Sequence, residues 1–305
     1  MNPILAVGSV AFDTIRNPFG EATRVVGGSA TYFSIAASFF TDVRLVAVVG
    51  EDFADRGDQL FGGRRIDCAG LQTVPGETFR WKGEYGFDLN SRETIYTKLN
   101  VFEQFHPDIP EGYRSSPIVF LGNIHPQLQL EVLDQVRSPR LVAADTMNLW
   151  IESTRRELGE VLKRVDILII NDSEARELSR EANLVKAARA IRAMGPKTVV
   201  IKRGEHGVLM TRAGDGEFFA APAMPLEEVF DPTGAGDTFA GGFVGSLAAC
   251  DEVDDQAMAR AIIYGSTLAS FAVEDFSLDR LLTLTESEIR DRFGCFKRLT
   301  HFEID

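Results

Sequence analysis

The residues best suited to chemistry lie in one segment, Asp231–Phe243, where glycines lead into a run of small and apolar residues. Gly234 and Gly236 carry no Cβ, so the backbone can turn sharply there and an anion can approach it closely. The N–H groups in the first turn of a following helix have no partner within the helix, and together with the helix dipole they favour a phosphate group. Asp237 stands beside these groups and can accept a proton. An anion site next to a base is what phosphoryl transfer to a hydroxyl group requires.

Asp237 also has a simpler interpretation, because an Asp in the first turn of a helix often only caps it or complements its dipole. The whole segment is more specific than this one residue. It matches neither G-x-x-x-x-G-K-[ST] nor G-x-G-x-x-G, and it resembles the signature of the ribokinase-like carbohydrate and nucleoside kinases, the PfkB family. The resemblance implies that Asp237 is the catalytic base. It also implies that the amides of Gly234, Ala235 and Gly236 hold the transferring phosphoryl group of ATP.

Asn171 and Glu174 follow an apolar run and lie three residues apart, on one face of a helix start. The PfkB family carries an N-x-x-E motif at this place. The resemblance implies that the pair organises Mg²⁺, largely through water, which suits an ion that keeps much of its hydration shell. The alternative is helix capping, with Asn171 or Ser173 as the N-cap and Glu174 favouring the dipole.

The segment Lys202–Gly207 resembles the part of the family that contacts the nucleotide. Gly204 and Gly207 would let the backbone approach the ligand, and Lys202 could reach a phosphate as a point charge. A plain hairpin between residues 199–201 and 208–210 is the alternative. Thr233 and the preceding Asp231 lie where some relatives bind a monovalent cation such as K⁺, and the sequence leaves open whether this chain does.

Asp13 ends the first apolar run, where the family uses an Asp to bind two acceptor hydroxyl groups. A simple turn residue is the alternative at this position. Gly27 and Gly28 match the double-glycine motif that brings a helix N-terminus close to the substrate. Tyr32 departs from the family, which usually has a sugar-binding Asn there. A phenol is longer and carries one hydroxyl group, so Tyr32 could bond a different acceptor, stack on a ring or close part of the pocket.

Four polar residues follow two other predicted strands: Asn123, His125, Asp145 and Asn148. Ligands in open α/β sheets bind beyond the carboxyl ends of the strands. We therefore expect these residues, Asn123 and Asn148 above all, near the acceptor.

Short, nearly continuous apolar runs alternate with helical patterns, as in a doubly wound α/β fold with a mostly parallel sheet and helices on both faces. The predicted strands are Ile4–Val10, Leu45–Val49, Ile118–Leu121, Leu141–Ala144, Ile167–Ile170 and Thr198–Ile201. The predicted helices are Ser29–Phe40, Gln127–Val136, Thr154–Lys163, Ser173–Arg180, Leu184–Met194, Thr238–Ala249 and Asp255–Ala272.

Residues 72–105 break this rhythm with period-two alternation, which predicts a small inserted β-sheet. Aromatic residues at Phe79, Trp81, Tyr85 and Phe87 alternate with charged ones. We expect one ribokinase-like domain over 1–305 whose lid is formed by about 14–26 and 72–106. The resemblance implies that the lid covers the acceptor, and a homodimer through the lid is a further expectation because some members pair this way. Packing of the aromatic residues within the lid itself is the simpler alternative.

The composition excludes several other classes of protein. The net charge of −13 argues against nucleic-acid or anionic-membrane binding. Three well-separated cysteines and four unclustered histidines suggest neither disulfides nor a zinc site and suit a reducing cytoplasm. No apolar run is long enough to span a bilayer, and the first residues predict no signal peptide.

Together these features predict an ATP- and Mg²⁺-dependent kinase that phosphorylates a hydroxyl group of a small sugar or sugar-like acceptor. A nucleoside kinase, with lid aromatics stacking on a base, is the alternative within the enzyme class. A non-catalytic sugar or nucleotide sensor on the same fold is the alternative outside it, although a pure binder has no need of a base at Asp237.

Overall fold

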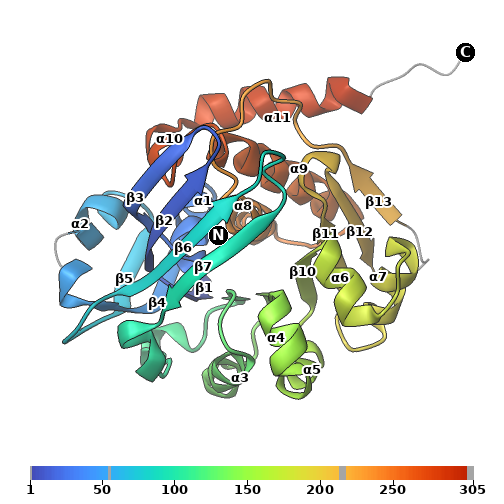
Figure 1. Ribbon diagram of the computed structural model, residues 1–305. Helices are drawn as coiled ribbons and strands as arrows, with labels where there is room; N and C mark the ends of the chain where they lie inside the picture. Colours follow the sequence, from blue (N-terminus) through green and yellow to red (C-terminus); the bar gives the residue numbers. More distant parts are fainter. Residues whose placement is uncertain (1, 54–55, 213–217, 301–305) are drawn as a thin grey trace, which may run out of the picture.

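The computed structural model of the chain, which describes residues 2–53, 56–212 and 218–300, contains one large and one small β-sheet (Figure 1). The large sheet is parallel except at β12 and β13. Its strands, in their order across the sheet, are β13 (Phe218–Ala221), β12 (Val208–Arg212), β11 (Thr198–Lys202), β10 (Ile167–Asn171), β9 (Leu141–Asp145), β8 (Ile118–Leu121), β1 (Ile4–Val7), β4 (Val43–Gly50) and β5 (Ile66–Val74).

Helices cover both faces of this sheet, as its apolar strands require. The α-helices are α1 (Ser29–Ser38), α2 (Arg56–Phe61), α3 (Pro126–Gln135), α4 (Asn148–Ser153), α5 (Arg155–Leu162), α6 (Asp172–Ser179), α7 (Leu184–Arg192), α8 (Ala235–Ala248), α9 (Asp255–Ala272), α10 (Asp279–Thr283) and α11 (Glu286–Thr300). Short 3₁₀ helices are η1 (Glu51–Phe53), η2 (Asn100–Gln104), η3 (Glu111–Tyr113) and η4 (Gly204–His206). No helix in the described ranges is long and apolar enough to cross a membrane.

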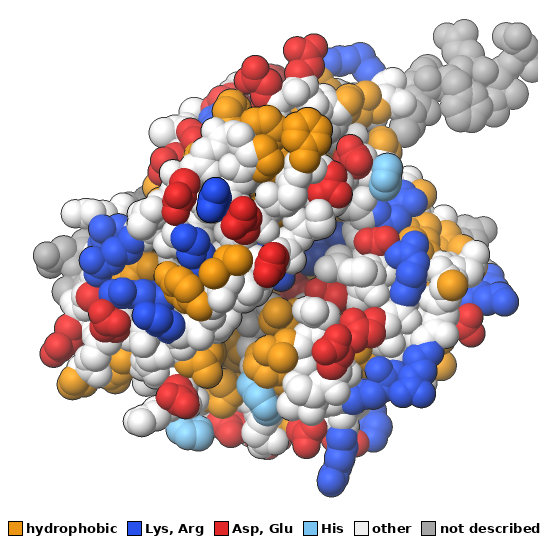
Figure 2. Space-filling view, in the orientation of Figure 1, with side chains coloured by type: hydrophobic (Ala, Val, Ile, Leu, Met, Phe, Trp, Pro, Cys, Tyr) orange, Lys and Arg blue, Asp and Glu red, His pale blue; other side chains and the backbone are white. Residues whose placement is uncertain are grey.

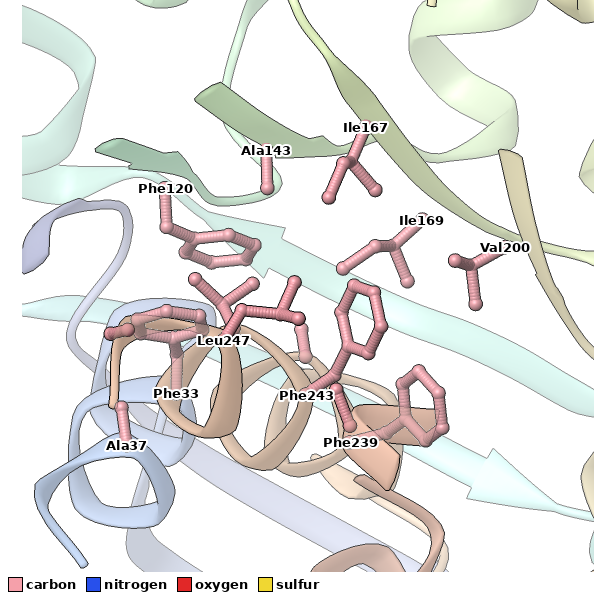
Figure 3. Packing of buried hydrophobic residues seen from close by; sticks show 14 of the residues in the cluster. Phe33, Ala37, Phe120, Ala143, Ile167, Ile169, Val200, Phe239, Phe243 and Leu247 are labelled. Atoms are coloured by element: carbon pink, nitrogen blue, oxygen red, sulfur yellow. The ribbon is translucent and has the colours of Figure 1, made fainter. Parts of the chain in front are cut away.

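The largest part of the core fixes α8 against the sheet. Phe33 of α1 stacks on Phe120 of β8 with ring centroids 3.7 Å apart, and Phe239 and Phe243 of α8 face the strands (Figure 3). The opposite face of the sheet packs on α3 and α5. Because α8 is held by buried aromatic side chains, its N-terminus has a fixed position relative to the strand ends.

The small sheet has the strand order β3 (Gly20–Gly27), β2 (Ala11–Asn17), β6 (Phe79–Tyr85) and β7 (Arg92–Lys98). It forms a separate layer in front of α8 in Figure 1. We call these four strands and their turns the lid. Strands β2 and β6 run parallel, whereas the β2–β3 and β6–β7 pairs are antiparallel.

The predicted α/β class is confirmed, and most predicted elements are present with shifted ends. Two predicted boundaries are wrong. The run Ile4–Val10 ends as a strand at Val7, because the chain turns at Gly8 and Ser9 and enters the lid at Ala11. Helix α8 begins at Ala235 rather than Thr238, so Asp237 lies inside its first turn.

The strand order reverses at β1, since the chain adds β4 and β5 on one side and β8 to β11 on the other. Gly8 and Gly122 follow the two strands at this switch point. A Cβ on either would lie 2.8 or 2.9 Å from Oγ of Ser29, the first residue of α1. The backbones therefore close tightly around the start of α1, at the edge where ligands bind in such sheets.

Candidate active site

The loop before α8 presents free backbone donors. Gly234 is the N-cap of α8 in the left-handed conformation (φ 76°), and no side chain caps the helix. The Ala235 N–H donates to the Pro232 carbonyl at 3.2 Å. Within the described part of the chain, no acceptor is found for the N–H groups of Gly236 and Asp237. These donors, at the positive end of the helix dipole, are suited to an anion.

Tyr32 lies directly beneath this loop. Its side chain is 1% exposed, and a Cβ on Gly234 would lie 2.3 Å from Cζ of its ring, so Gly234 is required for space as well as for its φ. The Tyr32 hydroxyl is buried without a hydrogen-bond partner among the described residues. The ring is thus covered by the loop, and the role of Tyr32 towards the acceptor stays a prediction.

Two further contacts fix the loop from below and from the lid. The Asp231 carboxylate accepts hydrogen bonds from the N–H groups of Thr233 (2.9 Å) and Ser277 (3.1 Å). The Thr233 hydroxyl is 3.0 Å from the hydroxyl of Tyr85, which is buried at the end of lid strand β6. The loop thus touches both the helical C-terminal part and the lid.

Lys202, the last residue of β11, reaches the same loop. Its Nζ lies 2.9 Å from where a Cβ of Gly236 would be, and it forms a 3.1 Å ion pair with Asp145 at the end of β9. Burial disfavours the Lys202 charge, but the carboxylates of Asp145, Glu174 and Asp237 outweigh this effect and raise its pKa. A permanently charged ammonium group therefore stands beside the free amides.

Asp237 has the electrostatics of a base that works near neutrality. Desolvation, with a smaller effect from the Asp145 charge, raises its pKa to about 7, while Lys202 and Arg92 oppose the rise. A carboxylate with a pKa of about 7 is about half ionised at pH 7, and its ionised form is basic enough to take a proton.

Asp13 in β2 lies against the double glycine. A Cβ on Gly27 would be 1.8 Å from Oδ2 of Asp13, and Gly28 has a φ of 95°. Burial, followed by the charges of Asp231 and Asp237, raises the pKa of Asp13 to about 8. The two glycines therefore make room for a buried carboxylate whose charge is destabilised by two like charges, and hydroxyl donors from a ligand would relieve that cost.

Asn171 and Glu174 form a complete capping box at the start of α6. The Asn171 side chain accepts the Glu174 N–H at 2.8 Å, and Oε2 of Glu174 accepts the Asn171 N–H at 2.9 Å. Burial and the Asp145 charge raise the pKa of Glu174 to about 7. The capping alternative is thus realised, and Glu174 keeps its second oxygen, Oε1, for which no hydrogen bond is found among the described residues.

Asn171 and Glu174 suit Mg²⁺ only if water and substrate phosphates supply most of its ligands. No group of three or more His, Cys, Asp or Glu residues that could hold a metal ion is found within the described residues. Mg²⁺ commonly uses one or two carboxylates and fills its other positions with water and substrate phosphates. Glu174 can serve as such a carboxylate, directly or through water, whereas the Asn171 oxygen is already engaged in capping.

The segment Lys202–Gly207, which we predicted to contact the nucleotide, forms a tight turn that touches the lid. Gly204 (φ 54°) begins η4 and Gly207 (φ 80°) follows it, and β11 and β12 pair antiparallel on either side, as in the hairpin alternative. A Cβ on Gly204 would lie 3.0 Å from Oδ1 of Asn90 in the β6–β7 turn. The lid therefore spans from the loop at Thr233 to the turn at Gly204.

The polar residues that follow β8 and β9, which we expected near the acceptor, differ in their contacts and exposure. Asn123 accepts a hydrogen bond from Nε1 of Trp150 at 2.9 Å, and His125 caps α3 through the Gln127 N–H. Asn148 is exposed at the start of α4. Asp145 is committed to Lys202. The structure thus places Asp145 beside Lys202 and gives His125 a local structural role.

Arg92 is a residue that the sequence analysis did not select. It is the first residue of β7, directly opposite Tyr85, and its guanidinium lies over the Trp81 indole, with Cζ 5.3 Å from the ring centroid. Its charge lowers the pKa values of Asp13, Glu174 and Asp237, which belong to three different elements. The alternation predicted the lid strands, but the cross-strand register that turns Arg92 towards the site, including the irregularity between Lys82 and Gly83, has no sequence signal.

These residues gather at one edge of the large sheet. The space-filling view, drawn from the same side as Figure 1, shows a hollow between the lid and the part of the molecule that carries α4 and α6, with acidic and basic side chains in its depth (Figure 2). The arrangement brings together the carboxylate of Asp237, the ammonium group of Lys202, the free backbone amides and the buried carboxylate of Asp13.

Comparison with known proteins identifies relatives that match most of the chain. A family described as "pfkB family carbohydrate kinase" matches residues 1–283. The chain is 32% identical over 250 residues to a cytidine kinase of Thermococcus kodakarensis, covering 80% of this chain and 88% of that protein.

Solved structures with the same fold include a protein called Ribokinase II from E. coli in complex with ATP and Mg²⁺ (TM-score 0.80, 19% identity, 97% of this chain and 100% of that one). They also include a Burkholderia thailandensis nucleoside kinase in complex with inosine (TM-score 0.75, 20% identity, 96% and 98%). At these identities the likeness shows the fold alone.

Proposed function

The chain belongs to the pfkB family of carbohydrate kinases, and within that family we propose that it transfers the γ-phosphoryl group of ATP to a hydroxyl group of a nucleoside. As a member of this family it is a phosphotransferase with an alcohol group as acceptor. The observation that carries the proposal is the position of Asp237, whose charge is coupled to Asp13 on one side and to Lys202 on the other.

Asp237 is the general base in this reaction. It takes the proton of the acceptor hydroxyl as that oxygen forms its bond to the γ-phosphorus, and the bond from this phosphorus to the bridging oxygen breaks to release ADP. The pKa of about 7 supports this role, because a base is most useful when its pKa is close to the working pH.

The charge of the transferring group is stabilised by residues around Gly236. The free N–H groups of Gly236 and Asp237 and the adjacent Lys202 ammonium are suited to its oxygens, whereas the Ala235 N–H is turned to Pro232. Glu174 would hold Mg²⁺, directly or through water, and the ion would neutralise part of the charge of ATP. Asp145 keeps Lys202 extended towards the loop.

The acceptor side favours a molecule with a diol and a flat ring. Asp13 can accept two hydroxyl groups of a ribose, and its direct partner in the neighbouring strand is Trp81. The Trp81 indole is held on the inner face of the lid, because Gly83 leaves space for it and Thr94 Oγ1 lies 3.3 Å from its Nε1. A nucleoside can place its ribose at Asp13 and its base at Trp81. The cytidine kinase relative supports the same choice.

A free sugar is the second candidate. Asp13, beside the double glycine, needs only a diol, and the matching family is described as one of carbohydrate kinases. A monovalent cation such as K⁺ near Asp231 and Thr233, cytoplasmic location and pairing of two chains through the lid are also retained as proposals from the family resemblance. Of these, a cation is the easiest to examine, by comparing activity in K⁺ and in a larger cation.

The test is an ADP-release assay with ATP·Mg²⁺ and a panel of cytidine, adenosine, inosine, ribose and fructose, with products identified by mass spectrometry. We expect a nucleoside monophosphate from the acceptor with the highest kcat/KM. Preference for ribose or fructose would select the second candidate. Binding of ATP without ADP release for any acceptor would favour a sensor and contradict the kinase.

A further inference from the structure

Asp52 lies at the root of the lid, close to the point where the chain passes from β5 into β6. It is the middle residue of η1, directly after β4, so it belongs to the large-sheet part of the molecule. Its Oδ1 accepts hydrogen bonds from the N–H (2.8 Å) and the hydroxyl group (2.6 Å) of Thr78, the residue before β6. Its Oδ2 forms ion pairs with Arg24 of β3 (3.2 Å) and Arg80 of β6 (3.4 Å). One carboxylate therefore joins the large-sheet part to two strands of the lid.

The contact with Thr78 is the rigid half of this junction. Thr78 is fully buried, and its hydroxyl oxygen also accepts the N–H of Gly50 at the end of β4 (3.0 Å). Burial acts to raise the pKa of Asp52, but hydrogen bonds from Thr78 and Arg80 outweigh this effect and lower the pKa, so the carboxylate is charged at neutral pH. The Thr78 contact thus fixes the point at which β6 leaves the large-sheet part.

The contact with Arg24 is the more exposed half, and a β-bulge creates it. In the pairing of β2 with β3, Thr14 faces two residues of β3 instead of one, and Arg24 is the second of them. Arg24 has a φ of 55°, which is unfavourable for a residue with a side chain and is retained where other contacts compensate. The bulge lies directly beside Asp13, so the backbone that turns Arg24 towards Asp52 also borders the carboxylate proposed to bind the acceptor.

An apolar contact supports the same junction. Phe53, which follows Asp52 in η1, packs on Phe12 with ring centroids 5.6 Å apart, and Cζ of Arg24 lies 5.0 Å from the centroid of the Phe12 ring. Phe12 is buried and directly precedes Asp13. Two adjacent residues of η1 therefore hold the lid strand that carries Asp13.

The lid carries the acceptor side of the site as one unit. Asp13 of β2 and Trp81 of β6 are direct partners across the two strands. Asp237 and Lys202 belong to α8 and β11 instead. A rotation of the lid about its root would therefore move both acceptor residues relative to the base and the ammonium group.

We propose that Asp52 is a positioning residue that holds the lid closed over the acceptor, with its bonds to Thr78 as the pivot and its ion pairs with Arg24 and Arg80 setting the degree of closure. This inference rests on the proposed function for the identity of the acceptor residues, whereas the lid position can be measured without turnover. A partly exposed ion pair is weak enough to break when the lid opens. The apparent affinity for the acceptor then falls with the fraction of molecules whose lid is closed.

The first experiment uses Asp52→Asn, which keeps an oxygen for the Thr78 donors and removes the charge that faces the two arginines. With the best acceptor of the panel, we expect the acceptor KM to rise about 5-fold and kcat to change less, because the bound acceptor itself favours the closed lid. The affinity for the ATP analogue AMP-PNP with Mg²⁺ (Mg·AMP-PNP), measured by calorimetry without acceptor, should be unchanged. Arg24→Gln should act in the same direction, and Arg24→Lys, which keeps the charge, should stay within about 2-fold of wild type.

The matched control is Arg16→Gln. Arg16 of β2 forms a 3.9 Å ion pair with Glu84 of β6, so this pair joins two lid strands to each other and does not reach the large-sheet part. The acceptor KM of Arg16→Gln should equal that of wild type.

The second experiment measures the lid without ligands. The chain contains two tryptophans, so Trp150→Phe leaves Trp81 as the single reporter. Acrylamide should quench its emission more strongly when Asp52→Asn is also present, because the open lid exposes its inner face. Arg16→Gln in the same background should leave the quenching constant unchanged.

The outcomes separate the two proposals. Unchanged quenching in Asp52→Asn, or a lower thermal midpoint with an unchanged acceptor KM, would overturn the positioning role and leave the proposed function intact. If Asp52→Asn does not fold, Arg24→Gln takes its place in both experiments with the same expected results. If wild type phosphorylates no acceptor, the proposed function fails, and the quenching experiment still decides whether Asp52 holds the lid.

Discussion

The hydroxyl groups of Thr233 and Tyr85 are 3.0 Å apart and join the loop before α8 to the inner end of lid strand β6. Both side chains are buried, with 8% exposure each. Since the N–H of Thr233 also bonds to Asp231, the lid is attached to the segment that presents the free amides. Lid position and loop geometry are therefore not independent.

This contact predicts a measurable cost for Tyr85→Phe. The ring packing is retained, and one buried hydrogen bond is lost, which typically costs about 1 kcal/mol. We expect a lower thermal midpoint and a severalfold lower kcat/KM, because the closed lid is less populated. Tyr96→Phe, on the outer part of the lid, is the control. Equal kinetics for the two variants would show that the Thr233 contact does not support closure.

Asp237→Asn tests the base directly. The variant keeps the size of the side chain and removes its basicity, so kcat should fall by about 10²-fold or more while the nucleotide affinity changes little. Near-normal turnover would exclude Asp237 as the base.

The pKa of Asp237 also sets a pH profile. Only the ionised carboxylate accepts a proton, and its pKa is about 7, so wild-type kcat/KM should rise with pH through this value. Lys202 lowers the pKa of Asp237, so Lys202→Met should move the rise to higher pH in addition to weakening phosphate binding. A rise at lower pH in Lys202→Met would contradict this electrostatic coupling.

The architecture and the order of the motifs were predictable because their physical signals are local. Buried parallel strands appear as apolar runs, and the turn at Gly234 requires a residue that tolerates a positive φ. The capping alternative for Asn171 was also correct, since an N-x-x-E spacing is what a capping box needs.

Contacts between distant strands were not predictable. The Lys202–Asp145 pair joins the ends of β11 and β9, which are separated by β10, so it depends on the order of strands in the sheet. The position of Arg92 depends on the register of β6 and β7. The burial of Tyr32 depends on how α1 and α8 pack. The identity of one residue in the sequence does not predict the packing of two helices.

Glu174 and Asn171 can be separated experimentally because the structure gives them different tasks. Glu174→Gln can keep the hydrogen bond to the Asn171 N–H but loses its charge, so we expect the Mg²⁺ concentration for half-maximal activity to rise by roughly 10-fold. Asn171→Ala removes the cap and should cost about 1 kcal/mol of stability with a smaller effect on the Mg²⁺ requirement. An unchanged Mg²⁺ titration for Glu174→Gln would leave the pair with capping alone.

Asp13→Asn should separate stability from function. The pKa of Asp13 is about 8 in the folded protein against an ordinary value of 3.8. The folded state therefore binds a proton that the unfolded chain has released, and stability falls as pH rises between these values. The neutral Asn removes this cost, so the midpoint of the ligand-free protein should increase by roughly 2 °C or more at pH 8 and by less at pH 5.

The same substitution should weaken the acceptor. A carboxylate accepts hydrogen bonds from two hydroxyl groups, whereas an amide offers one acceptor, so the acceptor KM should rise strongly while the affinity for Mg·AMP-PNP is retained. Glu93→Gln, an exposed carboxylate in lid strand β7, is the control, and its effect on the midpoint should be small at both pH values. If Asp13→Asn lowers the thermal midpoint at pH 8, the ionised carboxylate stabilises the fold. The buried charge at the double glycine would then have to be compensated by a partner such as Arg92 rather than by the acceptor.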